Sequence, residues 1–319
     1  FTLEWIPFYI LFLLRLGKGG KLGNLILASI FFALASLSSW YFGVFLILFT
    51  GLFYLYRLAF VKERFRSLFW EGLRLGSLSA ALTIPFLPIF WMGEAGVATG
   101  GFKIFVAGSA DLLSFFTPPQ NHALWGAQFS GIRERFIENP SLSAGYLGFT
   151  VLGLSLLALL KVKKRIVKFF AVVAVIFFIL ALGPYLKVGG LGGWGIDQPL
   201  GAIQSLPLPY YFLYKIPFFQ VTRATARFEL VTLLSLSVLM GFGLRYLMEK
   251  TRYKAIILVM VAALLLIEFF PKIPIGLETP IAVSSFYTDL AKEGGDFSVL
   301  QLPIDRSNYY IYDYYALKH

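Results

Sequence analysis

The sequence predicts an all-α bundle of transmembrane helices with about eight crossings. Three observations predict it: long apolar runs, bursts of lysine and arginine in alternate gaps between those runs, and a composition with 58% hydrophobic residues, a mean hydropathy of +0.75 and no cysteine. Runs of roughly 17–25 apolar residues can cross a hydrocarbon core about 30 Å thick. The backbone must form its hydrogen bonds within helices there. This composition argues against a soluble globular protein.

The apolar runs define the expected helices in order. The run at 3–14 is short and the chain starts with Phe1, so we expect a helix cut at its N-terminal side in a fragment of a longer protein. The run at 25–60 is too long for one crossing. Serines at 36, 38 and 39 followed by Trp40 predict a tight hairpin at the headgroup level, where aromatic residues are enriched. Further crossings are expected at 72–92, 143–160, 166–186, 226–248 and 255–270.

The basic bursts set the expected orientation. Short cytoplasmic loops carry an excess of lysine and arginine, and one alternate set of gaps holds most of the 28 basic residues: Arg15, Lys18, Lys21, Arg57, Lys62, Arg64, Arg66, Arg74, Lys161, Lys163, Lys164, Arg165, Lys168, Arg245, Lys250, Arg252 and Lys254. We therefore expect a multi-pass protein of the cytoplasmic (inner) membrane. The net charge of +11 is explained by topology and anionic lipid headgroups, and needs no nucleic-acid partner.

The opposite, extracytoplasmic side then receives the long loops 93–142 and 187–225 and the C-terminus. The sequence divides into a transmembrane domain at 1–272 and the beginning of a small extracytoplasmic α/β soluble domain at 273–319. Short apolar stretches at 286–290 and 299–302 and five tyrosines between 309 and 315 indicate that second domain. We expect this domain to be truncated at His319.

Several chemistries are excluded by residue counts. Without cysteine, the chain has no thiolate metal site and no cysteine nucleophile. Two histidines, His122 and His319, are too few for a histidine-built metal site. The glycine-rich turn at 189–195 lacks the lysine–serine pair of a phosphate-binding loop. No cofactor is certain, and a divalent metal stays open.

Chemistry is therefore expected at the extracytoplasmic loops. The apolar part of the first loop predicts an interfacial helix ended by Pro118 and Pro119. Asp111 in that segment is a candidate catalytic base or metal ligand, or a helix N-cap. In the second loop, Arg223 and Arg227 are four residues apart, which places them on one face of a helix. Two guanidiniums there could bind a phosphate bidentately; they could instead reach lipid headgroups or pair with Glu229 or an acidic loop residue.

Five segments carry a family resemblance: Trp5-Ile-Pro with Arg15-Leu, SWYFG at 39–43, the stretch from Asp111 to His122, IPFFQVTRATARF at 216–228 followed by GFGL at 241–244, and VLQLP at 299–303. Together they resemble polytopic bacterial and archaeal membrane proteins of the YfhO-like group, which are similar to glycosyltransferases of the C-type fold.

The resemblance implies an integral-membrane enzyme that transfers a sugar (hexosyl or pentosyl) from a polyprenyl-phosphate donor on the extracytoplasmic face. It places the main catalytic carboxylate in a first extracytoplasmic loop upstream of this chain. Arg223, Arg227 and His122 would bind the lipid-linked donor, and Asp111 would contribute from the later loop. Two other functions stay open: a transporter or lipid flippase, and a non-enzymatic membrane assembly protein. Membrane lipids are expected partners in each case.

Overall fold

The computed structural model describes residues 3–86, 101–136, 145–189, 207–272 and Lys292. The chain divides into two compact units, 1–271 and 272–319. The soluble domain and terminal tyrosines expected in the second unit, and His319, lie outside the described residues. In the described part of the first unit the secondary structure is helical, with two isolated β-bridges (His122–Pro271 and Tyr185–Pro207) and no strand.

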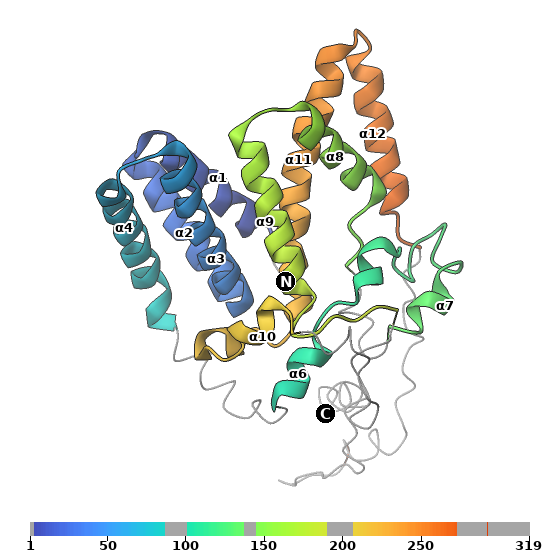
Figure 1. The fold of residues 1–319 in the computed structure, drawn as a ribbon, viewed down its shortest axis with the longest axis horizontal. Helices are drawn as coiled ribbons and strands as arrows, with labels where there is room; N and C mark the ends of the chain where they lie inside the picture. Colours follow the sequence, from blue (N-terminus) through green and yellow to red (C-terminus); the bar gives the residue numbers. More distant parts are fainter. Residues whose placement is uncertain (1–2, 87–100, 137–144, 190–206, 273–291, 293–319) are drawn as a thin grey trace. The chain divides into compact units, whose positions relative to one another are not determined.

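Long helices make up most of the described part of this unit (Figure 1). In chain order they are α1 (Trp5–Gly19), α2 (Leu22–Ser38), α3 (Trp40–Tyr56, continued by a π-helical turn at Arg57–Val61), α4 (Phe65–Thr83, continued by a 3₁₀ turn at Ile84–Phe86), α8 (Phe149–Lys161), α9 (Arg165–Ala181), α11 (Glu229–Lys250) and α12 (Lys254–Glu268). Each expected apolar run overlaps one of these helices, and the run at 25–60 overlaps two, so the prediction that helices form there is confirmed.

The helix boundaries follow local residue chemistry. The hairpin predicted at the serines is confirmed: Ser39 alone separates α2 from α3 and is extended, with φ −165° and ψ 131°. Gly20 ends α1 in the left-handed region, at φ 56°, and its N–H donates to the Leu16 carbonyl. The predicted start of the fourth helix at residue 72 is wrong, because α4 begins at Phe65. Glu71 lies within α4, and its carboxylate contacts the Arg57 guanidinium.

The turns with basic residues gather at one end of the unit. Arg165 donates to the Phe60 carbonyl over 2.6 Å, and the Lys164 ammonium lies 5.8 Å from the ring centre of Phe242. The α3–α4, α8–α9 and α11–α12 turns lie along the upper edge of Figure 1. We call this the basic end.

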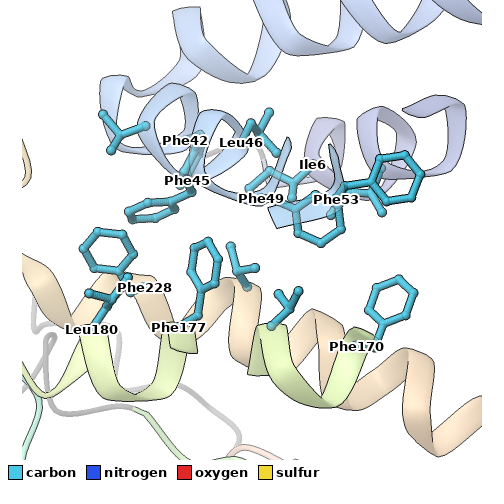
Figure 2. Packing of buried hydrophobic residues seen from close by; sticks show 14 of the residues in the cluster. Ile6, Phe42, Phe45, Leu46, Phe49, Phe53, Phe170, Phe177, Leu180 and Phe228 are labelled. Atoms are coloured by element: carbon cyan, nitrogen blue, oxygen red, sulfur yellow. The ribbon is translucent and has the colours of Figure 1, made fainter. Parts of the chain in front are cut away.

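Phenylalanine rings form the core between the two groups of helices (Figure 2). Rings on α3 point toward rings on α9 and toward Phe228, which precedes α11. The ring centres of Phe45 and Phe228 are 4.5 Å apart, and those of Phe49 and Phe169 are 5.7 Å apart. Offset and tilted aromatic pairs at these distances stabilise packing beyond simple burial. The α1–α4 group is thus joined to the α8–α12 group by an aromatic seam.

Two helices of the described part are long and apolar enough to cross a membrane: Trp40–Val61 and Thr225–Lys250. Other helices carry large apolar side chains on their outer faces. On α12, Ile256, Val259 and Leu266 are 63%, 67% and 69% exposed. Apolar surface of this extent is costly in water and is typical of a surface that contacts lipid or another protein. The fold therefore indicates a membrane protein.

Candidate functional site

Short helices and loops cover the end of the bundle opposite the basic end. They comprise α6 (Gly101–Ala107), α7 (Ser130–Arg133), α10 (Pro209–Leu213) and 3₁₀ turns at Leu112–Phe116, Pro217–Val221 and Thr225–Phe228. We call them the loop layer; α6, α7 and α10 lie along the lower part of Figure 1. The single interfacial helix predicted before Pro118 is wrong in detail: the segment forms α6 and a 3₁₀ turn, separated at residues 108–111. All four predicted site residues belong to this layer.

Asp111 is buried and caps the 3₁₀ turn at Leu112–Phe116. Its Oδ1 accepts hydrogen bonds from the Leu113 N–H at 2.8 Å and from the Gly189 N–H at 3.0 Å. One carboxylate oxygen therefore joins the first loop to the segment that follows α9. This geometry agrees with the N-cap alternative for Asp111; its role as a catalytic base stays a prediction.

His122 is buried, and both ring nitrogens are hydrogen-bonded to the protein. Nδ1 accepts from the N–H groups of Leu124 and Trp125, each at 3.1 Å, so Nε2 carries the proton and donates to the Glu268 carbonyl at 2.9 Å. The ring also stacks on Trp125, with ring centres 4.8 Å apart. His122 thus fastens the loop layer to the end of α12, and a ligand would have to replace one of these bonds.

Glu268, the last residue of α12, caps the start of α8. Its Oε1 accepts from the Tyr146 hydroxyl at 2.9 Å and from the Phe149 N–H, while Oε2 accepts from the Thr150 N–H at 3.0 Å. The first N–H groups of a helix lack partners within the helix and carry a partial positive charge. A carboxylate from the neighbouring helix satisfies both needs, so Glu268 holds α8 and α12 together.

Arg223 and Arg227 do not share one helix face, so the prediction from their spacing is wrong. Arg223 lies in a non-helical stretch, and Arg227 lies in the 3₁₀ turn Thr225–Phe228 that precedes α11. The cause is that neighbouring segments bind this backbone: the Ala224 N–H donates to the Tyr41 hydroxyl at 3.2 Å, and the Ala226 N–H donates to the Gly108 carbonyl at 2.8 Å. We call residues 222–228 the arginine segment.

Close contacts fix this arginine segment. The Tyr210 hydroxyl on α10 contacts Thr222 Oγ1 at 2.7 Å, and burial raises the pKa of Tyr210 above its usual range. A Cβ atom at Gly108 would lie 2.3 Å from the Arg223 carbonyl oxygen, so only glycine allows this approach.

Arg227 lies at the meeting point of α3 and α11. Its guanidinium carbon is 4.6 Å from the ring centre of Tyr41, the second residue of α3. A cation–π contact uses the face of the guanidinium, whose N–H donors lie in its plane. Two segments that we singled out from the sequence, SWYFG at 39–43 and the arginine segment, therefore contact each other.

The predicted alternative of pairing with Glu229 is not observed. Among the described residues, no ion pair joins Arg223 or Arg227 to Glu229. Glu229 Oε2 is buried without a hydrogen bond, and a Cβ atom at Gly145 would lie 2.4 Å from it.

Sequence reasoning missed a second cluster, at the basic end. Arg57 was counted as a loop cation, but it is 5% exposed and bound by two carboxylates. Its Nη2 lies 2.6 Å from Glu63 Oε2, its Nη1 contacts Glu71 Oε1, and the Tyr54 hydroxyl donates to that same Glu71 oxygen at 3.1 Å. The only signal in the sequence was two glutamates inside a basic burst.

No group of three or more histidine or acidic side chains in the described ranges could hold a metal ion. No protein-family model, curated protein or solved structure matches the chain.

Proposed function

We propose that the chain is a multi-pass protein of the cytoplasmic membrane with about eight crossings. The basic end would face the cytoplasm, and the loop layer and the C-terminus would face outside. The proposal is supported by the contacts between basic turns from different parts of the sequence, such as that of Arg165 with the Phe60 carbonyl. Lysine and arginine are retained on the cytoplasmic side of membranes.

Single cysteines test this topology, because the chain has none of its own. We expect Lys163→Cys to be protected from an impermeant maleimide in intact cells and labelled after permeabilisation. The matched variant Asn121→Cys, in the loop layer, should be labelled in both conditions. Labelling of Lys163→Cys in intact cells would contradict the topology.

We further propose that the loop layer binds the phosphate of a lipid-linked sugar and that the protein is a glycosyltransferase acting on a polyprenyl-phosphate donor. The observation that carries this proposal is the arginine segment, which contacts Tyr41, Gly108 and Tyr210 just before the start of α11. Guanidinium groups bind phosphate oxygens bidentately. A rigid backbone keeps the two arginines in place and lowers the entropic cost of binding.

Arginine-to-lysine variants test the phosphate role. Arg223→Lys and Arg227→Lys keep the charge but lose the planar fork, so donor binding should weaken by roughly tenfold, which is about 1.4 kcal/mol. Arg135→Lys is the matched control, because Arg135 is exposed in the same layer. Binding of a polyprenyl-phosphate sugar is measured on purified protein. If Arg223→Lys and Arg227→Lys bind the donor as tightly as Arg135→Lys and the parent protein do, the bidentate role is contradicted. Contact of the two arginines with lipid headgroups is then favoured.

The Arg57 cluster favours the second candidate, a transporter or lipid flippase. Ionisable residues buried in a membrane bundle commonly mark transport pathways. Glu71→Gln should then abolish movement of a fluorescent polyprenyl phosphate between the leaflets of reconstituted vesicles, while donor binding holds. If parent and variant move the lipid at the rate of protein-free vesicles, the cluster is structural and the flippase candidate fails.

A further inference from the structure

The outer face of α4 carries two parallel stripes of exposed residues along its first half. One stripe is apolar and consists of Phe65, Phe69 and Leu73. The other consists of the residues that follow these by one position: Arg66, Trp70 and Arg74. Helical residues four apart lie one above the other, so each stripe runs along two turns of α4. We call the first the apolar stripe and the second the donor stripe.

The donor stripe offers hydrogen-bond donors and no acceptor. A guanidinium has five N–H donors and an indole has one, and neither group accepts a hydrogen bond. In the described part of the chain, no ion pair or side-chain hydrogen bond engages Arg66, Trp70 or Arg74. The stripe therefore has the chemistry of a site for an anion with several oxygen atoms.

The nearest carboxylates do not neutralise the donor stripe. Glu71 is the one acidic residue in the sequence of α4. Its carboxylate contacts the Arg57 guanidinium and accepts from the Tyr54 hydroxyl at 3.1 Å. Glu63, just before α4, also binds Arg57. The buried guanidinium thus takes up both carboxylates, and the positive charge on the outer face of α4 stays uncompensated.

A second copy of this chain has no acidic stripe that would complement these arginines. In the ranges that the structure describes, the exposed acidic residues are Glu4, Glu134 and Glu249. Glu249 already pairs with Arg245 on its own helix. Glu4 precedes α1 and Glu134 follows α7, so neither lies on a long helix. The two arginines of the donor stripe are about 12 Å apart along the axis, and no such pair of carboxylates faces them.

The position along α4 matches the boundary between lipid headgroups and hydrocarbon. In the proposed topology α4 starts at the cytoplasmic side, and tryptophan is enriched at the headgroup level. Arg74 follows Trp70 by about 6 Å along the axis, toward the hydrocarbon. A charge in hydrocarbon is costly, so its long side chain turns back toward the headgroups. Arg66 precedes Trp70 by the same distance, so both guanidiniums can reach the level of the indole.

We infer that the two stripes of α4 together bind one anionic phospholipid of the cytoplasmic leaflet, an inference that rests on the proposed topology. The lipid phosphate lies between the guanidiniums of Arg66 and Arg74, which bind its oxygens bidentately, and accepts from the Trp70 N–H. An acyl chain lies along the apolar stripe. A free phosphate has no part to place there, so the apolar stripe selects a lipid. The uncompensated positive charge selects an anionic headgroup.

A photoreactive phosphatidylglycerol with a diazirine on its acyl chain tests the inference, with the whole chain in phosphatidylcholine nanodiscs. We expect a labelled peptide from the first half of α4. Arg66→Gln combined with Arg74→Gln should lower this labelling by roughly tenfold, because charged hydrogen bonds to the phosphate are lost. Lys161→Gln combined with Lys163→Gln is the matched control. It removes two exposed charges from another turn of the basic end and should label like the parent.

The outcomes separate the possible occupants. Absence of label on α4 overturns the lipid and leaves an acidic protein segment as the partner of the stripe. An equal loss in both double variants overturns the inference, because general charge would then attract the probe. Equal labelling by a photoreactive phosphatidylcholine overturns the preference for an anionic lipid. Displacement of the probe by soluble glycerol phosphate overturns the lipid in favour of a free phosphate.

A wrong topology is detected separately. Both leaflets of a nanodisc contain the anionic lipid, so labelling of α4 does not depend on which end faces the cytoplasm. If α4 is labelled while Lys163→Cys reacts with the impermeant maleimide in intact cells, the lipid site stands and its assignment to the cytoplasmic leaflet is overturned.

Discussion

The two ends of the helical unit use carboxylates in opposite ways. At the basic end, Glu63 and Glu71 neutralise the Arg57 guanidinium and close the turn between α3 and α4. At the loop layer, Asp111 and Glu268 bind backbone N–H groups instead. At the basic end, a charge pair closes a short turn. At the loop layer, capping carboxylates instead support long loops whose backbone has no regular hydrogen bonding of its own. Removing a charge should therefore have different consequences at the two ends.

The largest effect is expected at the basic end. Arg57→Leu leaves two carboxylates near one another without their cation, and removing one partner of a buried ion pair costs about 3–5 kcal/mol. Thermal unfolding of the purified protein in detergent measures the change. Arg245→Leu is the control, because Arg245 pairs with Glu249 while 67% of its side chain is exposed, and it should change little.

A double variant sharpens this prediction. Arg57→Leu combined with Glu71→Leu removes opposite charges together, so it should be more stable than Arg57→Leu alone. A double variant less stable than the single one would show that the leucines pack badly and that charge is not the cause.

A smaller effect is expected for Glu268→Gln. The amide keeps the shape but loses the charge that binds the α8 N-terminus, and hydrogen bonds to charged groups contribute about 1.5–3 kcal/mol. Limited proteolysis of the loop layer should speed up together with the loss of thermal stability. Glu249→Gln, at an exposed position, provides the comparison. If both variants unfold alike, Glu268 does not hold α8 and α12 together.

Asp111 distinguishes capping from catalysis. Asparagine is also a good N-cap, whereas alanine costs about 1 kcal/mol. If Asp111 acts only as an N-cap, Asp111→Asn should keep both stability and sugar transfer. Asp111→Ala should then lose stability. A stable Asp111→Asn protein that has lost transfer would instead identify a catalytic base, since general base catalysis contributes about 10²–10⁴-fold.

The smallest effect is expected for the contact of Tyr41 with Arg227. A cation–π pair at a partly exposed site contributes about 0.5–1 kcal/mol. A double-mutant cycle with Tyr41→Leu and Arg227→Leu isolates this coupling. Zero coupling in thermal unfolding would indicate that the ring and the guanidinium act independently.

Apolar runs were sufficient to predict the long helices and the hairpin at Ser39, because both depend on local composition. Tertiary contacts could not be predicted from the sequence. The spacing of Arg223 and Arg227 suggested a helix, but Tyr41 and Gly108, which are distant in sequence, bind that backbone. Arg57 resembled other loop cations because its burial depends on Glu71, in the next helix. The capping alternative for Asp111 could be derived from the sequence, whereas the hydrogen bonds at both ring nitrogens of His122 depend on the fold.

The one-residue turn at Ser39 bears on biosynthesis. A turn this short leaves α2 and α3 in contact along the same stretch of chain as soon as both are made. In the proposed multi-pass topology, such a hairpin would leave the translocation channel as a pair, with little polar chain to pass across the bilayer. Lengthening the turn with a hydrophilic insert would separate the two insertion events, and α2, the less apolar of the two, would then have to partition into lipid alone.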